Sequence, residues 1–447
     1  MRLLPVHGDG LILAHGIGGS TDLPIPRAYA LVGATWALVI SFVVLGFAWR
    51  TSRFRGDESG RPIPRALEAL VDGRLVRGGL RLLGLAFTGY VAMAAFLGED
   101  LLTNPTFGVV YVLLWVGMVV LSVLLGAVWP LLSPVRTIRV VFTKALRTDP
   151  RAGVLDYPAR LGYWPAAAGL LAFVWLELVK TPVYLAPIVL WFGVYFALMF
   201  VGSALFGTRW FERADPFDVY FGLAARLSPW GRRTDGRLVV RNPLENLDGL
   251  EQGPGLVAVV SVLFGSTGFD TFKDTLSWNN FVTRHNFDKM HADTIGLLAF
   301  VLAVGLTFAL ATIATGVLGQ IPHRQLPTQL AHSVVPIVLG YVIAHYLSFV
   351  VLQGQQTLIY LSDPLQRGWN VFGTANRGID YALADAPSVL ASFKVITVIT
   401  GHVLGVISSH DRAVRLLPRK RAIVGQLPLL ILMMCYTAGG LTLLLST

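Results

Sequence analysis

Residues 184–206 read Tyr-Leu-Ala-Pro-Ile-Val-Leu-Trp-Phe-Gly-Val-Tyr-Phe-Ala-Leu-Met-Phe-Val-Gly-Ser-Ala-Leu-Phe, a run without a charged side chain. A helix needs about 20 mainly apolar residues to cross the hydrocarbon layer of a bilayer. Across all 447 residues, 54% are hydrophobic and 14% are charged, whereas soluble domains carry about 25% charged residues. We therefore expect an all-α fold: a polytopic integral membrane helix bundle.

Nine further stretches have the same apolar character, so the sequence predicts ten transmembrane helices. The predicted spans are 28–49, 80–98, 108–129, 164–179, 184–206, 256–272, 292–316, 329–352, 388–407 and 423–446. They divide the chain into a tail (1–27), a five-helix N-terminal half (28–206), a linker (207–255) and a five-helix C-terminal half (256–447).

The positions of the basic residues predict the orientation of the bundle, because cytoplasmic loops are enriched in Lys and Arg. With the N-terminus outside, 27 of the 36 basic residues fall on the cytoplasmic side. The C-terminus then also lies outside. The net charge of +10 is therefore expected to face the anionic inner leaflet of a bacterial plasma membrane, and no nucleic-acid partner is predicted.

The predicted cytoplasmic loops are long, and we expect them to have no fold of their own. Within the linker, residues Asp215 to Trp230 mix aromatic, aliphatic and Arg side chains at helical spacing. Such a pattern is typical of an amphipathic helix lying on a membrane surface. The linker is accordingly predicted to be cytoplasmic and amphipathic.

The sixth span is interrupted by Gly265-Ser266-Thr267-Gly268. Glycine-interrupted spans mark binding sites in many transporters, since an unwound helix exposes backbone groups at membrane depth. We expect a span that unwinds near its outer end, with Ser266 and Thr267 available to a substrate. An irregular helix end is the alternative interpretation.

Ionisable side chains inside a membrane are energetically expensive and call for a partner or a function. His345 in the eighth span and Lys394 in the ninth are candidates for acid–base chemistry. The candidate carboxylate partners are Asp293, Asp380 and Asp385. The motif Gly401-xxx-Gly405 favours close packing of these two spans.

Two further histidines, His332 and His402, lie near the predicted inner boundary of spans eight and nine. One interpretation is a bis-histidine haem site, which requires the two helices to face each other there. The other is that each imidazole binds a neighbouring carbonyl or hydroxyl group.

A metal site is predicted at the outer start of the seventh span. His285, His291 and Asp293 suit a divalent zinc, copper or iron ion, and His15 lies on the same side of the membrane. The alternative is an interfacial loop with solvated polar side chains. The lone Cys435 excludes an internal disulfide.

The outer loop 353–387 is a candidate for substrate recognition, because long ordered loops often carry function. Asp363, Arg367, Trp369 and Arg377 are expected to form a lid over an anionic or planar group. A lid held by Asp–Arg pairs without a ligand is the alternative.

The motifs His15-Gly-Ile-Gly-Gly-Ser-Thr-Asp22-Leu-Pro-Ile-Pro and Ser362-Asp363-Pro-Leu-Gln-Arg367-Gly-Trp369-Asn allow a comparison with known families. The chain resembles a family of large, mostly uncharacterised membrane proteins of high-G+C bacteria, some of them labelled fenitrothion hydrolase. The resemblance implies hydrolysis of organophosphate esters, for which a metal-bound hydroxide would be suitable.

Three functions remain open from the sequence. The first is a metal-dependent membrane enzyme or redox protein with a site open to the extracytoplasmic face. The second is a proton- or ion-coupled transporter. The third is a non-catalytic subunit of a membrane complex, and a homo-oligomer is also open.

Overall fold

The computed structural model describes all residues except 1–18, 150, 182, 317–321, 419–421 and 447. Within these residues, nine helical segments are long and apolar enough to cross a membrane. The segments are α2 (Arg27–Ala48), α4 (Arg74–Leu97), Pro105–Leu125, α10 (Leu185–Phe206), α14 (Leu256–Lys273), α16 (Lys289–Gly316), α18 (Val335–Leu361), α19 (Pro387–Leu416) and α21 (Leu427–Leu444). The predicted all-α, multi-pass membrane bundle is confirmed.

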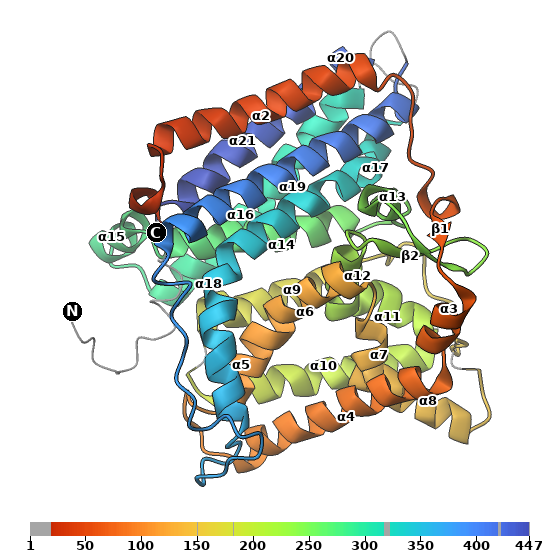
Figure 1. The fold of residues 1–447 in the computed structure, drawn as a ribbon, viewed down its shortest axis with the longest axis vertical. Coiled ribbons are helices and arrows are strands. Elements are labelled where there is room, and N and C mark those ends of the chain that lie inside the picture. Colours follow the sequence, from red (N-terminus) through yellow and green to blue (C-terminus); the bar gives the residue numbers. More distant parts are fainter. Residues whose placement is uncertain (1–18, 150, 182, 317–321, 419–421, 447) are drawn as a thin grey trace.

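The segment Pro105–Leu125 consists of three consecutive helices, α5 (Pro105–Gly108), η3 (Val109–Gly117) and α6 (Met118–Leu125). The remaining, shorter elements lie between or beside the long segments. They are η1 (Ser20–Asp22), η2 (Gly56–Glu58), α3 (Arg65–Val71), α7 (Trp129–Leu132), α8 (Pro134–Ala145), α9 (Trp164–Trp175), η4 (Leu176–Lys180), α11 (Thr208–Ala214), α12 (Pro216–Ala225), α13 (Pro243–Asp248), α15 (Leu276–Arg284), η5 (His323–Gln325), α17 (Leu326–Leu330), η6 (Ala331–Val334) and α20 (Ala422–Gly425). Figure 1 shows α2, α21, α19, α16 and α14 side by side above a second group that contains α9, α10 and α4.

The predicted span 164–179 is the one that falls short. It forms α9, of 12 residues, which continues as η4, a π-helical segment of 5 residues. At 1.5 Å per residue this helix is about 25 Å long, slightly shorter than the shortest of the nine segments above, α14 and α21 with 18 residues each. The sequence prediction of a helix here is confirmed, but the described chain has nine helical segments of the length and apolar character of a span, where ten were predicted.

Helices α18 and α19 pack through glycines, as the Gly401-xxx-Gly405 motif predicts. A Cβ atom placed on Gly401 would lie 2.5 Å from the carbonyl oxygen of Pro336, and one on Gly405 would lie 2.8 Å from that of Ser333. Any larger side chain at either glycine would push the two backbones apart. This contact fixes α18, which carries His345, against the upper group of helices.

The expected break in the sixth span is wrong, because α14 is continuous from Leu256 to Lys273. Ser266 and Thr267 both donate side-chain hydrogen bonds to the carbonyl of Leu263 in their own helix. Gly265 serves packing: a Cβ atom there would lie 2.7 Å from the Cα atom of Val301 in α16. Glycines in this span therefore allow close helix approach instead of unwinding.

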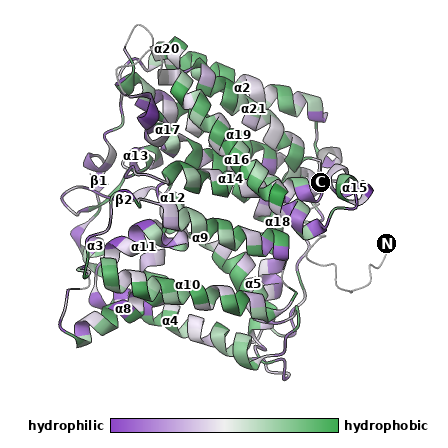
Figure 2. Ribbon diagram, turned by 180° about the vertical axis from the view of Figure 1, so that it is seen from behind, coloured by the Kyte–Doolittle hydropathy of each residue, from purple (hydrophilic) through white to green (hydrophobic). Residues whose placement is uncertain are grey.

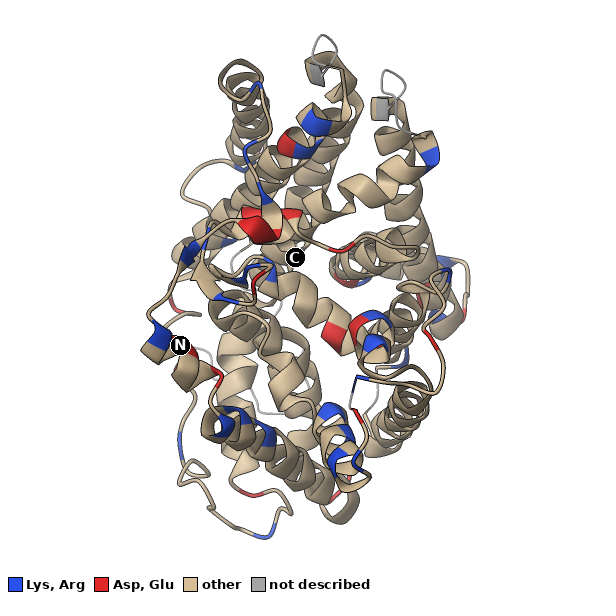
Figure 3. Cartoon of the chain, turned by 90° about the vertical axis from the view of Figure 1, so that its right-hand side faces the viewer, with Lys and Arg blue, Asp and Glu red and all other residues tan. Residues whose placement is uncertain are grey.

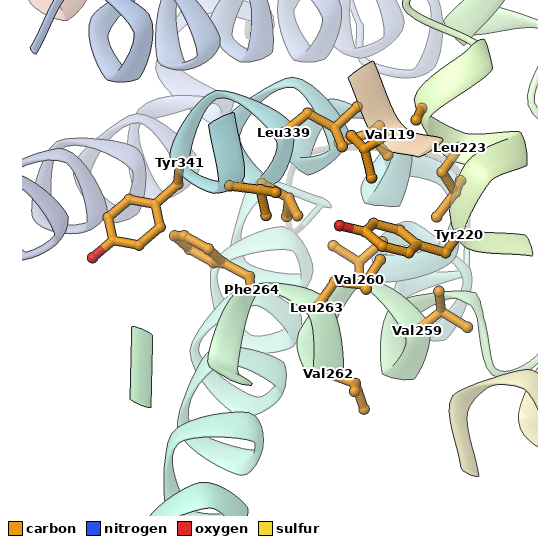
Figure 4. Close-up of a cluster of buried hydrophobic side chains, with 14 of the residues drawn as sticks. Val119, Tyr220, Leu223, Val259, Val260, Val262, Leu263, Phe264, Leu339 and Tyr341 are labelled. Atoms are coloured by element: carbon orange, nitrogen blue, oxygen red, sulfur yellow. The ribbon is translucent and has the colours of Figure 1, made fainter. Parts of the chain in front are cut away.

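The linker helix predicted on the membrane surface is instead buried. Eight of the ten residues of α12 are buried, and Figure 4 shows Tyr220 and Leu223 pointing among Val260 and Leu263 of α14. α12 packs against α6 and α9. The prediction was wrong because apolar and aromatic side chains surround this helix on more than one face, which favours burial over an interface.

The connecting segments also have a fold, contrary to expectation. β1 (Arg61–Pro62), β3 (Leu238–Val240) and β2 (Trp230–Arg232) form an antiparallel sheet in that order. We call the side of the molecule that carries this sheet, α3 and α13 the arginine-rich face; Figure 3 looks onto it. Figure 2 shows hydrophilic positions gathered at this face and around α15 at the opposite end, with apolar helices between.

Replacing Gly401 tests the α18–α19 contact. We expect Gly401→Leu to lower the free energy of unfolding in detergent by about 1–3 kcal/mol, the usual effect of overpacking. Gly439→Leu is the matched control, because a Cβ atom on Gly439 in α21 meets nothing within 4 Å. Equal stability of both variants would contradict the packing described.

Candidate functional site

The residues predicted to bind a metal do not converge. His285 Nδ1 lies 2.9 Å from the carbonyl of Phe281, and His291 Nδ1 lies 2.6 Å from Asp288 Oδ1. Hydrogen bonds from the backbone and side chain of His291 lower the pKa of Asp288. In the described part of the chain no three His, Cys, Asp or Glu side chains are grouped for a metal; His15 lies outside that part.

Asp293 has its own structural environment. Its carboxylate accepts a hydrogen bond from Trp278 Nε1 at 2.7 Å and lies 3.1 Å from Lys289 Nζ. The side chain is 3% exposed. Asp293 therefore ties α15 to the start of α16 through Trp278 and Lys289, whereas the predicted acid–base residues His345 and Lys394 lie on α18 and α19.

Lys394 is buried in α19, with 1% of its surface exposed. α19 packs there against η1, and the negative charge of Asp22 acts on the ammonium group. The structure thus places Lys394 beside the N-terminal segment, whereas His345 contacts α14.

His332 and His402 each contact a carbonyl of the chain just before them. His332 Nδ1 lies 3.1 Å from the carbonyl of Gln329, and His402 Nδ1 lies 2.8 Å from that of Val398. Both side chains are buried. Within the described residues the Nε2 atoms of both rings are buried without a hydrogen-bond partner, so the contacts of the Nδ1 atoms agree with either interpretation.

The outer loop is ordered mainly by its own hydrogen bonds. Asp363 accepts from the backbone N–H groups of Arg367 and Gly368 at 2.9 and 2.8 Å, so its carboxylate holds a turn. Trp369 is 43% exposed, and Arg377 donates its backbone N–H to Thr374. The four predicted recognition side chains therefore do not form a closed lid.

A different group of polar side chains converges inside the bundle. His345 Nε2 lies 2.9 Å from Asp270 Oδ2, and the hydroxyl of Tyr346 donates to the same oxygen at 2.8 Å. On the other side of the imidazole, Thr271 Oγ1 lies 3.4 Å from His345 Nδ1 and 3.1 Å from the hydroxyl of Tyr341. We call these five residues the Asp270 cluster.

The Asp270 cluster is shielded from water by helix packing. All five residues are at most 4% exposed. α14 supplies the acid and the threonine, and α18 supplies the histidine and both tyrosines, with Tyr341 and His345 four residues apart on one helix face. The α18–α19 glycine contact and the α14–α16 glycine contact hold these two helices in place.

Lys273 and Glu177 extend the cluster. Lys273 Nζ lies 3.2 Å from Asp270 Oδ1 and 3.4 Å from the carbonyl of Leu178. Glu177 is subject to the charges of Asp270 and Lys273; within the described chain its Oε2 atom is buried without a hydrogen-bond partner. Glu177 stands on η4, and π-helical turns inside α-helices occur frequently at functional sites.

Asp274 connects the cluster to the surface near α15. It follows the last residue of α14 and is exposed. Partial desolvation raises the pKa of Asp274 above its ordinary value, and the charges of Lys273 and His345 act in the opposite direction. The polar groups therefore become progressively more buried, from exposed Asp274 through half-buried Lys273 to Asp270 and His345.

This arrangement suits proton exchange. Histidine is the side chain whose charge changes most readily near neutral pH, and a carboxylate within hydrogen-bond distance stabilises its protonated form. Asp270 also contacts Lys273, so one carboxylate is shared between two basic groups. A proton bound at His345 would change the charge balance of the entire cluster.

The sequence indicates His345 as a candidate, but it was not paired with Asp270 or Tyr346. A carboxylate within the predicted span 256–272 was a usable signal, since ionisable residues inside membranes are rare and functional. Glu177 lies three residues before Lys180, a spacing that in the sequence alone indicates an interfacial ion pair.

The comparisons with known proteins add no identification. No family model, no curated protein and no solved structure matches the chain. The site is therefore interpreted from its own geometry.

Removing the central carboxylate tests the cluster as a buried charge network. We expect Asp270→Ala to lower the free energy of unfolding by about 3–5 kcal/mol, because it leaves Lys273 and His345 without their buried counter-charge. Asp288→Ala, which removes the exposed partner of His291, should change stability little. Thermal unfolding in one detergent would compare them, and similar losses in both variants would contradict the role of Asp270.

Proposed function

We propose that this protein is a proton-coupled membrane transporter in which the Asp270–His345 pair takes up and releases the proton. The observation that carries the proposal is the 2.9 Å contact between these two side chains inside an apolar helix bundle. In a purely structural role, well-packed apolar side chains would stabilise the bundle at least as well, since buried ion pairs rarely add net stability.

The graded polarity of the site supports the same function. Asp274 is exposed, Lys273 is half-buried, and Asp270 and His345 are at most 4% exposed. Proton relays in membrane pumps and transporters are built from such series of acidic and histidine side chains. Placed in a bacterial plasma membrane with the N-terminus outside, this route would open to the extracytoplasmic side.

The enzyme alternative has less support in the geometry. The predicted metal ligands His285, His291 and Asp293 each contact a different neighbour. Hydrolysis of an organophosphate, as the family resemblance implies, needs an activated water close to a bound ester. The Asp270 cluster is closed by Tyr341 and Tyr346, which suits proton transfer better than binding of an ester.

Proton movement can be measured in vesicles that contain the purified protein and a trapped pH-sensitive dye. A potassium gradient with the ionophore valinomycin makes the vesicle interior electrically negative, which drives protons inward. We then expect the interior of vesicles with the wild-type protein to acidify several-fold faster than that of empty vesicles. Asp270→Asn and His345→Gln should reduce the rate to that of empty vesicles, because each removes one titrating partner.

The matched controls are Asp288→Asn and His291→Gln, which alter an exposed Asp–His pair of similar chemistry. Both should keep the wild-type rate. Wild-type acidification no faster than that of empty vesicles, or equal loss in the control variants, would overturn the proposal.

A further inference from the structure

A second feature of the bundle lies far from the Asp270 cluster along the chain. A cavity of about 470 Å³ lies between α4, η3, α7 and α10. Its walls are almost wholly apolar and include Val91, Val110, Leu113, Phe192 and Phe196. We call this cavity the apolar chamber.

The apolar chamber is long and opens sideways. On α4 it is lined from Leu83 to Phe96, a distance of about 20 Å along the helix axis. These two end residues are 60% and 70% exposed, so they face the surroundings of the bundle, which in a membrane are lipid chains. The shape suits an extended hydrocarbon chain that enters from the bilayer.

The face of α4 that lines the chamber carries two arginines beyond the end of the chamber. Arg77, Arg81, Gly84, Thr88, Val91 and Ala95 follow one another at spacings of three and four residues on α4. Residues at these spacings share one face of a helix. The last four line the chamber, so the two arginines extend the same face toward the arginine-rich end of the helix.

The arginines have unused capacity for an anion. Among the described residues, Arg81 Nε is buried and has no hydrogen-bond partner, and the positive charges of Arg77 and Arg136 act on Arg81. Arg77 makes only a long contact of 3.7 Å with Asp72. Two guanidinium groups thus lie next to one another with little negative charge to balance them.

The chamber wall supplies one further donor. Trp129 lines the chamber and is 8% exposed, and its Nε1 atom is buried without a partner in the described chain. Buried indole N–H groups usually find an acceptor. Trp129 belongs to α7, directly before α8 with Arg136, and so it stands at the arginine end of the chamber.

We propose that the apolar chamber binds an anionic phospholipid, with an acyl chain between α4 and α10 and the phosphate at Arg77 and Arg81. Basic pockets between transmembrane helices recognise such headgroups, and the hydrocarbon wall gives the chain a matching environment. The proposal is independent of the proton site.

Native mass spectrometry of the detergent-purified protein tests the proposal, with phosphatidylglycerol and phosphatidylcholine of identical chains as probes. The wild type should bind the anionic lipid at least fivefold more tightly. Arg81→Gln should weaken phosphatidylglycerol binding about fivefold, since one Arg contributes ~1 kcal/mol near an anionic lipid headgroup. Phosphatidylcholine binding should weaken less, because its choline group offsets the charge of the phosphate. Arg65→Gln, at the exposed start of α3, is the control.

A second variant fills the chamber itself. A Cβ atom on Gly193 meets nothing within 4 Å, and this residue lines the chamber; Gly193→Phe should therefore weaken binding of both lipids at least fivefold. Gly89→Phe, on another face of α4 with equally open space, should not.

Unchanged phosphatidylglycerol binding in Gly193→Phe would overturn the proposal. An Arg81→Gln variant that keeps the wild-type preference for phosphatidylglycerol over phosphatidylcholine would also overturn it. This second variant keeps the test decisive even if Gly193→Phe fails to fold. Displacement of the lipid by millimolar inorganic phosphate would also overturn it, because it would indicate a site for the free anion.

Discussion

The cost of placing a charged side chain in an apolar environment is the constraint on which the rest of this structure depends. An ionised carboxylate at membrane depth is tolerated only with partners that offset its lost hydration. The carboxylate of Asp270 contacts His345, Tyr346 and Lys273. Since these come from α14 and α18, the two helices must be held together closely, and the glycine contacts to α16 and α19 do this.

The same constraint explains the buried linker helix. Asp215, before the first residue of α12, accepts hydrogen bonds from the backbone of Phe217 and from the hydroxyl of Tyr195, and Asp218 pairs with Arg136 at 2.6 Å. With its two carboxylates satisfied, α12 presents only apolar and aromatic surface to the core. It joins the two groups of helices by packing against α6 and α9 and touching α14 through the side chains seen in Figure 4.

Much of the fold was predictable because long apolar runs such as 184–206 have few other uses. The short helix 164–180 was harder, since its length lies between that of a span and that of a core helix. Gly265 could not be interpreted from the sequence alone: glycine permits both an unwound helix and a close helix contact, and only the position of Val301 in α16 decides between them.

Only part of the candidate site could be predicted, because the sequence does not show which distant side chains meet in the fold. His345 stands out in its span, but its partner Asp270 lies 75 residues earlier, and nothing in the sequence pairs the two. The predicted metal site finds no support among the described residues for a different reason. His285 and His291 are close in sequence, yet a helix end and a turn point them to different local acceptors.

The most direct test of the central claim is the protonation of His345 itself. Nitrogen-15 NMR of histidine-labelled protein in lipid nanodiscs would follow its imidazole across the pH range, with His345→Gln providing the assignment. The account predicts that the nitrogen-15 signals of the His345 imidazole change with pH and that Asp270→Asn alters this response, because the two side chains lie 2.9 Å apart. Signals that do not change with pH, or a response that is the same in both proteins, would contradict it.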